Sequence, residues 1–76
     1  MTAPRFEPVP RLPAHHLRGA TLADGPRLWT CGALGGDVSL SVNAAGVHHA
    51  HIISPAVARA IAAELLACAD VYGGSP

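Results

Sequence analysis

The clearest potential for chemistry lies in the histidines of the run His48-His49-Ala50-His51. Side chains two positions apart on a strand point to the same side, so His49 and His51 can present two imidazoles to one metal ion. His15 and His16 would add ligands if their segment lay beside this one. Without a nearby carboxylate or thiolate the site is incomplete, and the alternative interpretation is a set of surface histidines that bind metal adventitiously.

The other polar residues show no arrangement typical of catalysis. Gly32, Gly35 and Gly36 do not lead into a helix, as a phosphate-binding loop requires. The carboxylates lack paired spacing for acid–base chemistry, and no serine has the setting of a nucleophile elbow. We therefore expect a protein that is not an enzyme and that uses no cofactor. Cys31 and Cys68 are expected to be buried thiols, with a disulfide or redox pair as the alternative.

The composition predicts a small core. Half of the 76 residues are hydrophobic, but many of these are alanines, and the chain has one Phe, one Trp and one Tyr. A chain of this size buries only about 60% of its unfolded surface, so few large side chains are available to stabilise a monomer. Oligomerisation is a common remedy, and we expect a homodimer.

The charge balance argues against some partners. The formal net charge is zero, which disfavours duplex DNA and anionic membranes as partners. The N-terminus lacks the apolar segment of a signal peptide, and no apolar run is long enough for a membrane span. We therefore expect a cytoplasmic protein with no nucleic-acid or membrane partner.

The order of residues predicts an α+β fold, a three- or four-stranded antiparallel meander packed against one C-terminal helix. Residues 1–14 are rich in proline, which favours an extended arm, and residues 15–76 form a single small domain. Strands are predicted over residues 15–22, 28–33, 38–42 and 47–52. Trp29, Cys31 and Ala33 share one strand face, which we place toward the core.

The turn Asn43-Ala44-Ala45-Gly46 sets the faces of the last strand. We expect a type I turn with Gly46 in the left-handed region, followed by a bulge. The bulge would place Val42 opposite His48. The core face would then carry His48, Ala50 and Ile52, and the outer face Val47, His49 and His51 together with Ser39 and Ser41. Without the bulge, these faces exchange.

The stretch from Ser54 to Tyr72 predicts a helix. Ser54 caps it, Pro55 suits the first helical position, and Gly73 and Gly74 end it. The stripe expected to face the sheet consists of Val57, Ile61, Leu65, Cys68 and Tyr72. Leu66 lies on the opposite side, and a strip of small residues runs between the two faces. The predicted dimer interface is Ala58, Ala62, Leu66 and Ala69, and the alternative is an ordinary alanine-rich surface helix.

The hairpin from Val38 to Gly46, the Ser54-Pro55 cap and the alanine-rich helix resemble small accessory proteins of actinobacteria and their phages. The resemblance covers about the last half of the chain. It implies binding to a host protein and carries over no site residue. The sequence therefore predicts a homodimeric protein-interaction module, with a small metal-binding protein that uses His49 and His51 as the alternative. Nucleic-acid binding through the arginines of the arm is a third, disfavoured possibility.

Overall fold

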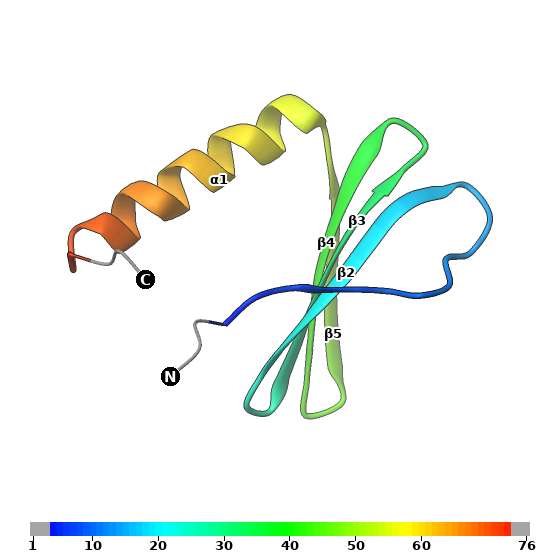
Figure 1. The fold of residues 1–76 in the computed structure, drawn as a ribbon, viewed down its shortest axis with the longest axis horizontal. Coiled ribbons are helices and arrows are strands. Elements are labelled where there is room, and N and C mark those ends of the chain that lie inside the picture. The colour runs from blue at the N-terminus through cyan, green and yellow to red at the C-terminus, as the bar shows by residue number, and fades with distance from the viewer. Residues whose placement is uncertain (1–3, 74–76) are drawn as a thin grey trace.

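The computed structural model describes residues 4–73 as one antiparallel sheet followed by one helix. The elements are β1 (Glu7–Pro8), β2 (His16–Asp24), β3 (Arg27–Leu34), β4 (Asp37–Ala44), β5 (Val47–Ile53) and α1 (Pro55–Asp70). The strands are ordered β1-β2-β3-β4-β5, and α1 leaves the end of β5 and projects to one side of the sheet (Figure 1). The predicted α+β class is confirmed, but the sheet has five strands instead of three or four.

The fifth strand comes from the proline-rich arm. Within the described part of the arm, Glu7 pairs with Thr21, and the Val9 amide donates to the Gly19 carbonyl at 2.9 Å. Proline is tolerated in this strand because it lies at the edge of the sheet. Gly19 permits the close approach, since a Cβ there would lie 2.8 Å from Cδ2 of Leu12. The arm thus borders the sheet along β2.

The β4–β5 hairpin differs from the predicted one. Ala45 and Gly46 both have positive φ, 51° and 79°, and Val42 pairs with His49. Positive φ at both central residues defines a type I′ turn, whose twist matches that of the flanking strands. The positive φ of Gly46 was predicted correctly, but the bulge was wrong. Ala45 in the left-handed region is conformationally unfavourable, but this turn keeps the two strands in continuous register.

The absence of the bulge exchanges the two faces of β5. The register places His49 and His51 opposite Val42 and Leu40, so these histidines share the apolar face of the sheet. This face also carries Trp29, Cys31 and Ala33, as predicted. The predicted core positions of β5 lie instead on the other face, with Ser39 and Ser41, and they are His48, Ala50 and Ile52.

Helix α1 begins as predicted. Ser54 is extended, with φ −70° and ψ 157°, and its Oγ accepts from the Val57 amide at 3.2 Å. The helix ends at Asp70, and Gly73 follows with φ 67°. No residue of α1 is buried. The predicted sheet-facing stripe was only partly right, because the side toward the sheet carries Ala58, Ile61, Ala62 and Leu65.

The folded chain exposes more surface than its mass predicts. Its accessible surface is 6102 Å², whereas a folded monomer of this mass exposes about 4,300 Å². Its radius of gyration is 13.5 Å, against about 11.4 Å for a compact domain of this length. Among residues 4–73, only the hydrophobic side chain of Ala20 is buried. The reason is visible in Figure 1, where α1 lies against the sheet only near its start.

Candidate functional site

The most prominent site is an apolar groove between α1 and the sheet, with a volume of about 390 Å³. The sheet supplies large side chains to it, and the helix supplies two alanines and two larger residues. The lining residues are Phe6, Leu22, Trp29, Cys31, Val38, Leu40, Ile53, Ala58, Ile61, Ala62 and Leu65. None of these side chains carries a charge, so the groove suits an apolar occupant.

The groove follows from the local sequence. Alternation along β3 and β4 directs Trp29 and Leu40 to the same face, and Ile53 continues this face to the start of α1. The small side chains of Ala58 and Ala62 leave the space between helix and sheet unfilled. Leu65 remains 64% exposed although it lines the groove. A contiguous exposed apolar surface of this kind usually marks an interaction site.

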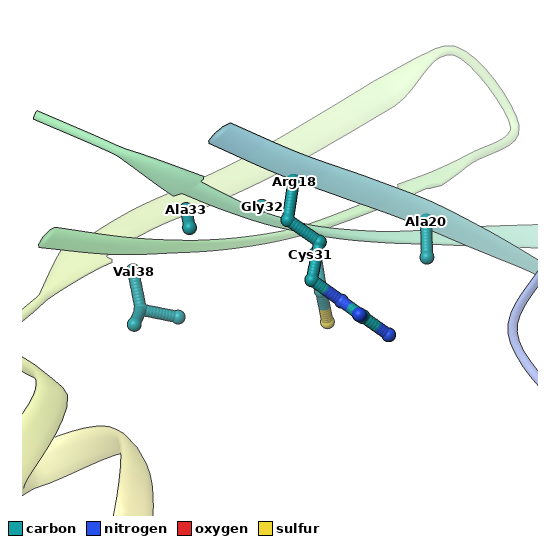
Figure 2. Close-up of a pocket in the computed structure, with 6 residues that line it drawn as sticks. All are labelled: Arg18, Ala20, Cys31, Gly32, Ala33 and Val38. Carbon is teal, nitrogen blue, oxygen red and sulfur yellow. The ribbon is translucent and has the colours of Figure 1, made fainter. Parts of the chain in front are cut away.

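A smaller pocket of about 230 Å³ adjoins the groove on the same face of the sheet. Figure 2 shows the side chains of Arg18 and Cys31 pointing to the same side as those of Ala33 and Val38. Burial raises the pKa of the Cys31 thiol. Because the thiolate is the nucleophilic form, this environment makes Cys31 a poor nucleophile at neutral pH.

The two candidate metal ligands are brought together. His49 and His51 line a pocket of about 220 Å³ with Trp29, Leu40 and Val42. The structure thus confirms a shared face for the two imidazoles, although it is the apolar face and not the serine-bearing one. Across residues 4–73, no group of three or more metal-ligating side chains is present. One copy of the chain therefore offers two ligands here.

The additional ligands considered from sequence lie elsewhere. Two strands separate β2 from β5, so His16 is not beside His49. The ring of His16 instead lies 3.8 Å from the position of a Cβ at Gly32, on the face that carries Ser39. His15 precedes β2 in a turn, with φ 73°. Neither histidine extends the site on β5.

The predicted interface residues occur at intervals of four, four and three along α1, so they form one stripe, of which only the first part borders the groove. Ala58 and Ala62 line the groove, whereas Leu66 is 66% exposed at its flank and Ala69 is exposed further along α1. Leu22 also lines the groove and was not predicted to do so, although its alternation with Ala20 along β2 carried the signal.

The two cysteines remain apart. Cys31 and Cys68 are both free, and Cys68 is exposed on α1, where its thiol donates to Oε2 of Glu64 at 3.4 Å. The prediction that both thiols are buried was therefore wrong for Cys68. The C-terminal half of α1 projects away from the sheet (Figure 1), and Cys68 on that half is exposed to solvent.

The comparisons with known proteins do not extend this description. No family model matches the chain, and no curated protein or solved structure was found to match it. Across the described residues, no helix combines the length and the apolar character that crossing a membrane requires. The groove and the β5 strand are therefore the features of this chain that bear on its function.

Proposed function

We propose that this chain is a non-enzymatic protein-interaction module that works as a homodimer, with the groove between α1 and the sheet as its contact surface. The observation that carries the proposal is the uncharged lining of a groove left open between the only helix and the only sheet of residues 4–73. A second copy is the occupant, because each copy brings the same unfilled groove and the same projecting helix.

The exposed area supports a second copy as the partner. The chain exposes 6102 Å², which exceeds the surface of a compact monomer by about 1,800 Å². If each of two copies buried this excess, the interface would total about 3,600 Å², which falls within the range of obligate homodimers. A closed twofold arrangement satisfies both grooves at once and leaves neither groove open for the addition of a third copy.

The helix is the element that reaches the second copy. It projects from its own sheet, and Leu65 and Leu66 remain 64% and 66% exposed on adjacent sides of it. The predicted interface of Ala58, Ala62, Leu66 and Ala69 stays a prediction within this arrangement. Binding of a host protein, which the resemblance to accessory proteins of actinobacteria and their phages implies, also stays a prediction.

Sedimentation velocity at micromolar concentration tests the dimer. The wild-type chain is expected to sediment as a dimer, and Leu65→Arg is expected to be monomeric because it places a charge in the groove. Leu17→Arg is the matched control, since Leu17 is 82% exposed on β2 and does not line the groove. This control should remain dimeric.

Leu66→Arg distinguishes two forms of the interface. If the contact includes the outer flank of α1, Leu66→Arg should dissociate the dimer together with Leu65→Arg. If only the groove is used, Leu66→Arg should stay dimeric. A monomeric wild-type chain, or a Leu65→Arg variant that remains dimeric, would show that the groove is not a dimer interface.

A further inference from the structure

Strand β5 is an unprotected edge of the sheet. Within residues 4–73 it pairs only with β4, and six of its seven residues are exposed. It contains no proline, lysine or bulge, which are the features that usually prevent edge strands from pairing with another chain. The opposite edge, β1, has two residues and includes Pro8. The sheet therefore offers one long edge for strand addition.

The register identifies which backbone groups of β5 are free. The two residues that flank a two-residue turn form a hydrogen-bonded pair through their backbones. In this hairpin they are Ala44 and Val47. Hydrogen-bonded pairs alternate along an antiparallel ladder, so the amides and carbonyls of alternate β5 residues point away from β4. These residues are His48, Ala50 and Ile52.

A β5 strand from a second copy can hydrogen-bond to the free backbone groups of all three residues in a single register. When two β5 strands run antiparallel about a twofold axis at Ala50, Ala50 faces its own copy and His48 faces Ile52 of the second copy. Any shift along the strand leaves at least one of these residues without a partner. Each hydrogen-bonded pair exchanges two bonds, so this register forms the largest number of cross-chain bonds available to the edge.

The same register assembles histidines. The non-hydrogen-bonded pairs between the two strands are His49 with His51 of the second copy, and the reverse. Such pairs have Cβ atoms about 4.5–5.5 Å apart, and residues two apart on one strand are separated by about 6.8 Å. All four imidazoles lie on one face, because His49 and His51 share a face within each copy.

We propose that two copies pair through β5 and bind one zinc ion between His49 and His51 of each copy. Zinc accepts four nitrogen ligands in tetrahedral geometry at about 2.0–2.1 Å, which four imidazoles around a twofold axis can provide. The site is incomplete in one chain, which supplies two of the four ligands. Because the edge of β5 is distinct from the groove, this pairing does not depend on the proposed dimer.

No other side chain among residues 4–73 is placed to supply the two missing zinc ligands. Cys31 lies on the same face but on β3, two strands from His51, or about 9.6 Å across the ladder. Trp29 and Leu40, together with Val42, border the histidines and carry no metal ligand. The second copy is therefore the source of the missing ligands.

Zinc titration of the full-length chain, followed by sedimentation velocity, tests the site. Zinc is expected at least to double the mass of the species present without metal, because a dimer formed through the groove would carry two β5 edges. One zinc should bind per two chains, and EDTA should reverse the change. The double variant His49→Ala/His51→Ala should lose the doubling. The matched control His15→Ala/His16→Ala should retain it, since those residues lie away from β5.

A second variant tests the strand pairing itself. Ala50→Pro removes the amide at the twofold axis but leaves both ligands and the β4 ladder in place, because that amide points away from β4. It should abolish the zinc-dependent doubling, with the circular dichroism spectrum unchanged. Doubling that survives Ala50→Pro, binding of one zinc per chain, or no response of the mass to zinc would each overturn the proposal.

Discussion

At the scale of single residues, the β4–β5 turn determines the chemistry of the molecule. Ala45 and Gly46 occupy the left-handed region, with φ 51° and 79°, and this pair fixes His49 opposite Val42. Glycine adopts that conformation without penalty, whereas in alanine the Cβ makes it sterically unfavourable. A turn of one more residue would have moved both imidazoles to the serine-bearing face.

This turn yields a paired prediction. Gly46→Ala should lower the free energy of unfolding by about 1 kcal/mol or more, because alanine disfavours positive φ. Ala45→Asn should raise it, because Asn-Gly is the preferred sequence of a type I′ turn. Urea denaturation of both variants measures the two changes. Equal destabilisation by both substitutions would contradict the turn type.

Cys31 gives a second prediction at this scale. Burial raises its pKa above the ordinary value of 9.0, so the unfolded chain releases the thiol proton at a lower pH than the folded chain. The stability that the neutral thiol contributes is therefore present below about pH 9 and is lost as pH rises toward the folded pKa. A thiol reagent at pH 8 should also modify exposed Cys68 before Cys31.

The stability of the chain measured by urea denaturation between pH 8 and pH 10 checks the sign. Cys31→Ala should flatten the alkaline decline, and Cys68→Ala, the matched control, should leave it unchanged. A steeper decline in Cys31→Ala than in the wild type would contradict the assignment.

At the scale of elements, α1 depends on its own sequence more than on packing. It has no buried residue, so its stability comes from alanine propensity and from the cap at Ser54. An isolated helix of this length is marginal in water, because nucleation is costly. The cap is therefore expected to matter more here than in a helix held by a core.

Ser54→Ala tests this dependence. Loss of the bond from the Val57 amide to Ser54 Oγ should destabilise the helix by about 1 kcal/mol. The helical signal at 222 nm should fall. Ser54→Asp is the control, since aspartate also caps helices. A helical signal unchanged in Ser54→Ala would show that packing, and not the cap, holds α1.

At the scale of the whole molecule, one layer of sheet and one helix do not enclose a core. The excess exposed surface and the open groove have the same origin, since α1 lies against the sheet only near its start. If a second copy fills the groove, folding and association are linked. The melting temperature should then depend on protein concentration.

Calorimetry at two concentrations checks the linkage. A tenfold increase in chain concentration should raise the wild-type melting temperature, because the dimer is favoured by mass action. Leu65→Arg should melt at a lower temperature that does not vary with concentration. A concentration-independent melting temperature in the wild type would support a monomer.

The sequence by itself determined the elements. The signals were local: the alternation in Val38–Val42, the cap at Ser54 and Pro55, and the glycines after Tyr72. Each of them favours a backbone conformation at its own position, whatever the rest of the chain does. They predicted the meander, the helix and its bounds to within a few residues. They also predicted that His49 and His51 share a face.

Only the tertiary structure decided which face of the sheet carries His49 and His51. The choice between a two-residue turn and a bulge depends on the competition between the strain at Ala45 and the register of the whole ladder, and no single residue specifies it. The rotation of α1 about its own axis is likewise a tertiary feature, and it places Ala58 and Ala62 toward the sheet. The weak pairing of the proline-rich arm with β2 depended on Gly19 and Leu12 meeting in space, a contact that spacing along the chain does not encode.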